Sequence, residues 1–172
     1  MSFPNVIYGR DGTQFETHAA PAQTNGAGRY PLGTKLILPD GRVFRYVRAG
    51  GTALVAGNVI QAPANTANHV DLTPSAAAID AMTITVTLGA TAATINDYAE
   101  GYAVISVTPG AGRAYKIASH PAAALSATLE LTLAAGNGIE VALTTTSRVD
   151  LIRNPYDGVI QAPVTTLTRE PV

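Results

Sequence analysis

The clearest pattern along the chain is an alternation of apolar and polar residues in short runs. In Met82–Leu88 every second residue is apolar and the three residues between are threonines, and the run 127–133 places its leucines on one face in the same way. Successive side chains of a strand point to opposite faces, so this alternation predicts half-buried β-strands.

Similar short runs continue along the chain, separated by turn residues and without a long amphipathic helix between them. About eight strands at this spacing predict an all-β fold, an antiparallel β-barrel or β-sandwich. Besides the two runs above, strands are predicted at Lys35–Leu38, Arg42–Val47, Tyr102–Val107, Arg113–Ser119, Ile139–Leu143 and Arg148–Ile152.

The strongest turn signal is Pro39-Asp40-Gly41, which separates two of these runs. Proline, aspartate and glycine in this order favour a type I turn with a glycine bulge, so the flanking strands are expected to pair antiparallel. Phe44 and Tyr46 share one face of the second strand, and we expect that face to be turned toward the core.

The two ends of the chain lack a persistent period and carry several prolines. We therefore divide the chain into an extended N-terminal arm (1–33), a β core (34–153) and an extended C-terminal arm (154–172). The arms are expected to contact neighbouring molecules, because their apolar residues would otherwise face water. The expected interface residues are Phe3, Pro4, Val6, Ile7, Tyr8, Val159, Ile160 and Pro163.

The pentapeptide Val-Ile-Gln-Ala-Pro occurs twice, at 59–63 and at 159–163. The residues beyond the two copies do not match, and the chain between them shows no repeat of fixed period, so a duplicated domain is not indicated. Two β-branched residues closed by proline favour a short edge strand. Both copies are therefore expected to mark places where the chain leaves the β core.

Composition narrows the classes of function. Charged residues make up 13% of the 172 residues, about half the usual share, and the net charge is −1. This charge balance does not indicate nucleic-acid binding. So few charged residues protect a free monomer poorly against self-association, which favours a protein that functions as part of an assembly. The absence of cysteine excludes thiolate chemistry, and we find no secretion signal and no apolar run of membrane-spanning length. A soluble protein made in the cytoplasm is expected.

Candidate chemistry is sparse. The three histidines, His18, His69 and His120, lie far apart in loop-like sequence, although a fold or a three-fold axis could assemble them. Asp97 with Glu100, and Asp150 with Asp157, are acid pairs that could serve a sugar or calcium site. The favoured interpretation is solvated loop residues, and we expect no catalytic, cofactor or metal site and no enzyme activity.

One stretch carries a family resemblance. Tyr30–Ala62, YPLGTKLILPDGRVFRYVRAGGTALVAGNVIQA, resembles small structural proteins of tailed bacteriophages, and Glu100–Ala123 is similar in character. The resemblance rests on turns and strands and carries no site residue. It implies a capsid decoration (cement) protein, or another virion component, made in the host bacterial cytoplasm and bound to the major capsid protein on the capsid surface.

Three functions remain open at this point. The first is a virion structural protein that decorates the outside of a phage head as a homo-oligomer, taken here as a trimer. The second is a tail or fibre component, or another self-assembling filament or adhesive. The third is a small enzyme acting on polysaccharide through Asp97 and Glu100.

Overall fold

A computed structural model of the chain describes residues 6–9 and 30–162. These residues contain eleven strands and one 3₁₀ turn but no α-helix, which confirms the predicted all-β fold. The chain divides into two compact units: unit 1 comprises 1–64 and 155–172, and unit 2 comprises 65–154. The single β core expected at 34–153 is therefore divided after Ala64, because residues 35–45 pair with Val6–Tyr8 and with each other, residues 48–61 pair with Asp157–Gln161, and neither group pairs with the strands of unit 2.

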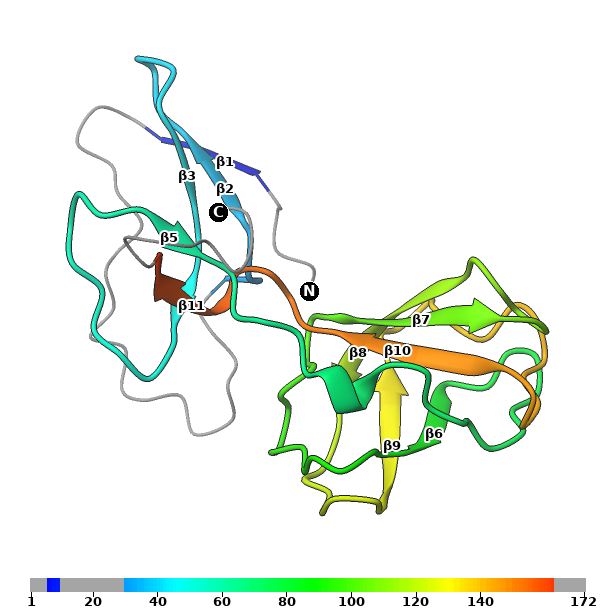
Figure 1. Cartoon of the computed structure of the whole chain (residues 1–172). Coiled ribbons are helices and arrows are strands. Elements are labelled where there is room, and N and C mark those ends of the chain that lie inside the picture. The colour runs from blue at the N-terminus through cyan, green and yellow to red at the C-terminus, as the bar shows by residue number, and fades with distance from the viewer. Residues whose placement is uncertain (1–5, 10–29, 163–172) are drawn as a thin grey trace. The chain divides into compact units, whose positions relative to one another are not determined.

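Unit 2 is built on a five-stranded sheet with the strand order β10-β7-β8-β9-β6, and every neighbouring pair is antiparallel (Figure 1). The strands predicted at Tyr102–Val107 and Arg113–Ser119 are present as β7 and β8, and they pair antiparallel around the Pro109–Gly112 loop. The elements of unit 2 are η1 (Ala67–His69), β6 (Thr83–Thr87), β7 (Tyr102–Val107), β8 (Ala114–Ser119), β9 (Thr128–Leu133) and β10 (Arg148–Ile152).

The core of unit 2 follows from the alternation in its strands. In β6, Ile84 and Val86 are buried and face the buried Leu131 and Leu129 of β9, while the outer threonines Thr83 and Thr87 are exposed. The other strands contribute alternate residues to the same core, and burial of each large aliphatic side chain stabilises the unit by roughly 1.5–3 kcal/mol. Those residues are Ala103, Ile105, Tyr115, Ile117, Leu133, Val149 and Leu151.

The outer edges of this sheet are partly covered by the segment 72–75. Leu72 and Val149 of β10 exchange two backbone hydrogen bonds of 3.0 and 2.9 Å. On the opposite edge strand, β6, the amide of Ser75 donates to the carbonyl of Thr85 over 2.8 Å. These contacts are isolated bridges and not a continuous ladder, so an all-β fold is established but a closed barrel is not confirmed. Covered edges leave few free backbone groups to pair with other chains.

The strand predicted at Ile139–Leu143 is wrong. Ile139 and Leu143 are buried, but both contact the single segment 77–81: the amide of Ile139 donates to the carbonyl oxygen of Ala81, and Leu143 forms an isolated bridge with Ala77. The apolar residues of this run therefore predicted burial correctly but not a β-ladder, which requires a continuous partner strand.

Unit 1 contains two small sheets, with the strand orders β1-β2-β3 and β4-β11-β5 (Figure 1). The predicted hairpin around Pro39-Asp40-Gly41 is confirmed, since β2 and β3 pair antiparallel. Phe44 lies opposite the buried Leu36 but is itself exposed, contrary to expectation, because strands of three residues offer too few side chains to cover it. The strands are β1 (Val6–Tyr8), β2 (Lys35–Ile37), β3 (Val43–Arg45), β4 (Arg48–Ala49), β5 (Ile60–Gln61) and β11 (Asp157–Gln161).

Both predicted arms contribute strands to unit 1, which corrects the expectation that they leave the β core. The segment Val6–Tyr8 pairs parallel with β2, and Asp157–Gln161 is the central strand of the second sheet. Val6–Tyr8 was not recognised, because three residues are too few to show a period. The second Val-Ile-Gln-Ala-Pro copy was expected in an edge strand, but it lies in the central strand of its sheet. Residues 1–5, 10–29 and 163–172 of the arms lie outside the described residues.

Gly101 provides a test of the packing in unit 2. A Cβ at this position would lie 2.3 Å from the carbonyl oxygen of Ile152 and 3.0 Å from that of Tyr98, and both are backbone atoms that cannot turn aside. We expect Gly101→Ala to lower the free energy of unfolding by about 3 kcal/mol, because the backbone itself must shift. Urea unfolding followed by circular dichroism measures this change.

The matched control is Gly51→Ala, since nothing lies within 4 Å of a Cβ there. We expect this substitution to change the free energy of unfolding by less than about 1 kcal/mol. Equal effects of the two alanine substitutions would show that the close approach at Gly101 is not a constraint.

Candidate interaction surfaces

Unit 2 holds one buried polar network, centred on His69 and Tyr98. The Nε2 atom of His69 lies 2.9 Å from the carbonyl oxygen of Thr91, which can only accept, so Nε2 carries the proton. The Nδ1 atom therefore accepts a hydrogen bond from the hydroxyl group of Tyr98. Burial raises the pKa of Tyr98. Both nitrogens of His69 are thus used inside the fold.

His120 extends this network from the other side. Its Nε2 accepts from the backbone amide of Tyr98 at 3.0 Å, and its Nδ1 donates to the carbonyl oxygen of Pro121 at 2.7 Å. The guanidinium of Arg153 lies 5.5 Å from the centre of the Tyr98 ring and pairs with Asp97 at 3.2 Å. The network fixes the turns that cross this end of unit 2, and neither histidine has a nitrogen left to bind a metal or activate a nucleophile.

The predicted acid pairs also have carboxylates that are used in contacts within the fold. Asp97 accepts from the amide of Thr94 at 3.0 Å besides pairing with Arg153. Asp150 accepts from the amide of Asp71 at 2.7 Å. Across residues 6–9 and 30–162 no three His, Asp or Glu side chains gather where they could hold a metal ion, and no helix is long and apolar enough to cross a membrane. His18 lies outside the described residues.

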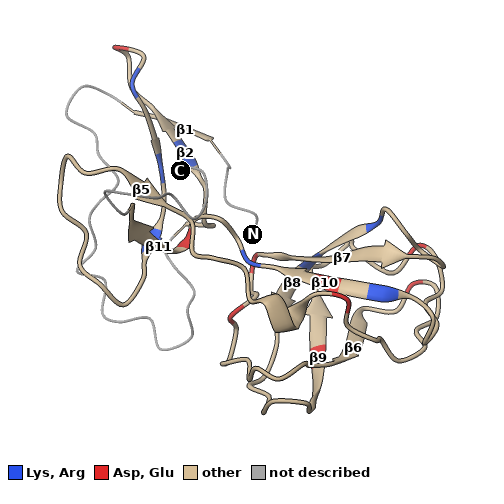
Figure 2. Ribbon diagram, in the orientation of Figure 1, with Lys and Arg blue, Asp and Glu red and all other residues tan. Residues whose placement is uncertain are grey.

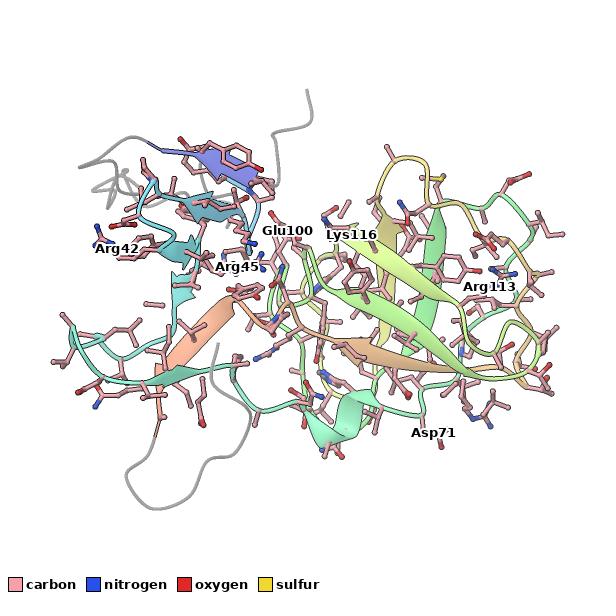
Figure 3. The ribbon with its side chains drawn as sticks, turned by 90° about the horizontal axis from the view of Figure 1, so that it is seen from above. Arg42, Arg45, Asp71, Glu100, Arg113 and Lys116 are labelled. Carbon is pink, nitrogen blue, oxygen red and sulfur yellow. The ribbon has the colours of Figure 1, made fainter. Side chains whose placement is uncertain are left out.

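Among the described residues, charged side chains do not gather into a binding patch. Figure 2 shows basic and acidic residues scattered singly over both units, and in Figure 3 Arg113 and Lys116 lie apart on unit 2. Three arginines that lie close together in the sequence each have a separate partner: Arg42 pairs with Asp40, Arg45 donates to the carbonyl oxygen of Gly33, and Arg48 pairs with Asp157. A single site for an anion is therefore not formed by them.

A repeated turn is the most distinctive feature of unit 2. In each of four places a bridged residue is followed by a β-turn whose fourth amide donates to the first carbonyl over 3.0–3.3 Å. In three of the turns the third residue has a positive φ of 57° to 64°, as a type II turn requires: Asp80, Asn96 and Ser126. The turns span 78–81, 94–97, 124–127 and 144–147.

Three of these turns present a large aliphatic side chain to water at the same position. The exposed fractions are 58% for Ile79, 68% for Ile95 and 62% for Leu125, and the fourth turn has Thr145 there. Three branched aliphatics at equivalent turn positions contribute little to the packing of unit 2, since they remain largely exposed. We call Ile79, Ile95 and Leu125 the aliphatic turn tips.

The aliphatic turn tips were not predicted, although the sequence contains a pattern that identifies their turns. The three turns are written Ala-Ala-Ile-Asp at 77–80, Ala-Thr-Ile-Asn at 93–96 and Ala-Ala-Leu-Ser at 123–126. The spacing between them is irregular, so a search for a fixed period passes over them. A search for alanine followed three positions later by aspartate, asparagine or serine would have found all three.

In unit 1 an apolar row crosses the first sheet. Tyr8, Ile37 and Val43 occupy paired positions on β1, β2 and β3, so they share one face, and Tyr8 and Val43 are exposed. Of the expected interface residues, Val6 and Tyr8 are exposed on β1, Ile7 and Ile160 are half-buried, and Val159 is fully buried inside unit 1. Phe3, Pro4 and Pro163 lie outside the described residues.

The buried histidine gives unit 2 a predictable response to pH. Burial holds the pKa of His120 below its ordinary value of 6.5. Between 6.5 and that lower pKa the unfolded chain binds a proton that the folded chain does not, so the free energy of unfolding decreases as the pH falls through this window. Thermal unfolding at several pH values between about 7.5 and about 5.5 measures the decrease.

A matched variant isolates this contribution. In His120→Gln the side-chain oxygen can still accept from the amide of Tyr98, but it does not titrate. We expect the variant to lose less stability than the natural protein over the same pH window. An identical pH dependence in the two proteins would show that His120 is not the group responsible.

Comparison with protein-family models, with curated proteins and with solved structures finds no match to this chain. No relative therefore supplies a site or a partner by similarity. The features that bear on function are those of the chain itself: polar side chains used internally, apolar side chains presented at equivalent turns of unit 2, and an apolar row on the first sheet of unit 1.

Proposed function

We propose that the chain is a virion structural protein that decorates the head of a tailed bacteriophage and stabilises its coat lattice. The observation that carries the proposal is the set of aliphatic turn tips, Ile79, Ile95 and Leu125, which face water at equivalent positions of the described unit 2. Exposed apolar side chains that contribute nothing to their own unit's packing are typical of surfaces that become buried in a complex.

The chemistry of the described residues supports the same proposal. The buried histidines and the tyrosine satisfy one another, and the acids beside them hold turns. A protein that binds a lattice requires broad, rigid surfaces and no reactive group, and the backbone hydrogen bonds within the turns of unit 2 supply such rigidity. The resemblance of Tyr30–Ala62 to phage structural proteins supports a phage particle as the assembly to which the chain binds.

The proposed partner is the major capsid protein, and the proposed location is the outer surface of the head. A homo-oligomer, with a trimer as the working assumption, would multiply the number of aliphatic turn tips presented to the lattice, and several weak contacts acting together bind far more tightly than one. The second candidate function is a tail, fibre or filament component. It is favoured by the exposed apolar row Tyr8–Ile37–Val43, which suits contact between like copies.

The test replaces the aliphatic turn tips with serine. Because Ile79, Ile95 and Leu125 are largely exposed, the triple variant is expected to fold normally. Loss of one to three buried aliphatic contacts, at roughly 1.5–3 kcal/mol each, should weaken binding to heads by at least about tenfold. Co-sedimentation with heads of the phage that encodes the chain measures the affinity, and calorimetry of the heads measures the stabilisation.

The control is Thr145→Ser at the fourth turn, which changes an equivalent position without removing a large aliphatic side chain. We expect it to bind heads as the natural protein does. Natural protein that fails to bind heads, or that assembles alone into filaments, would contradict the decoration role, and unchanged binding of the triple variant would contradict the role of the tips.

A further inference from the structure

The two copies of Val-Ile-Gln-Ala-Pro pair with each other in unit 1. Ile60 lies opposite Gln161 and Gln61 lies opposite Ile160, in antiparallel register. Since the second copy repeats the first, exchanging the two segments leaves the pairing unchanged. This reciprocal arrangement is the one that two identical strands adopt across a two-fold axis between identical chains.

Burial alone does not explain why the two segments have the same sequence. Val59 is 57% exposed whereas Val159 is fully buried, and Gln61 is buried whereas Gln161 is exposed. Central and edge strands meet different neighbours and would ordinarily carry different residues. What the two segments share is the ladder in which each is the other's partner.

The second copy also carries the strand on which this sheet depends. β11 is central, and β4 and β5 pair with it and not with each other. The guanidinium of Arg48 holds the carboxylate of Asp157 through two contacts of 2.5 Å, and the amide of Gly50 donates to the carbonyl oxygen of Val159 over 2.9 Å. Without β11 the sheet has no ladder at all.

The segment that supplies β11 reaches unit 1 from the far end of the chain. Residues 65–154, which form unit 2, separate it from β5. Tyr156 leads into the strand and its ring packs on Gly33, where a Cβ would lie 2.7 Å from the ring. Every one of these contacts would form equally well if the segment came from a second copy, so the choice between the two depends on chain entropy and concentration.

We propose that β11 is exchanged between copies of this chain, so that residues 155–162 of one copy complete the β4-β11-β5 sheet of another. The occupant of the β5 edge is therefore the second Val-Ile-Gln segment of a neighbouring copy. The exchange links copies through unit 1 and leaves unit 2 free to contact other partners. It goes beyond the proposed decoration role and does not depend on it.

Cysteine pairing tests this exchange, because the natural chain has no cysteine and each introduced thiol is unique. Full-length Ile60→Cys and full-length Gln161→Cys, one of them enlarged by a tag, are unfolded, mixed, refolded together and oxidised. Exchange predicts a disulfide-linked heterodimer on non-reducing gels, at least about tenfold above the level from a control mixture of Thr87→Cys with Gln161→Cys. Circular dichroism verifies that each variant folds.

The pair Gln61→Cys and Ile160→Cys gives a second measurement of the same ladder. Mixed single variants of both pairs that link no more than the control would overturn the proposal. So would a monomeric mass of the natural protein by light scattering at the concentration used for refolding. Neither assay contains phage heads, so a monomer that still binds heads would overturn the exchange and leave the decoration role intact.

Discussion

The pairing of β5 with β11 is the constraint on which the arrangement of the chain depends. It brings residues about a hundred positions apart into one ladder, and it makes unit 1 a product of both ends of the described chain. The ion pair between Arg48 and Asp157 secures the other side of β11. β4 and β5 precede unit 2 in the sequence, whereas β11 follows it. Unit 2 is therefore inserted in the sequence between two strands of unit 1.

Unit 2 is stabilised in a different way. Its alternating strands bury one continuous core, isolated bridges partly cover the edges of its sheet, and its histidines and tyrosine satisfy each other. The bridged backbone groups are not available for pairing with other chains. What it presents instead is side chains at turns, and the same turn repeated around the unit places an aliphatic residue outward three times. Its contacts with a partner would be made by tips and not by a cleft.

The sequence predicted unit 2 well because long alternating runs identify strands and their buried faces. Ile84, Leu131 and Leu133 are buried as their pattern required. It predicted the β2–β3 hairpin of unit 1 but neither β1 nor the central position of β11, because a three-residue strand shows no period and the pairing of β11 joins segments remote in sequence. The aliphatic turn tips were missed for another reason: an exposed isoleucine in a turn looks like any loop residue until the fold shows that three of them are equivalent.

We propose that this chain lies on the outer surface of a phage head. Cryo-electron microscopy of intact particles from the phage that encodes it would locate the chain. We expect density for the two β-rich units on the outside of the head, with the turns of Ile79, Ile95 or Leu125 against the coat lattice. Density for the chain in the tail, in the fibres or inside the shell would contradict it.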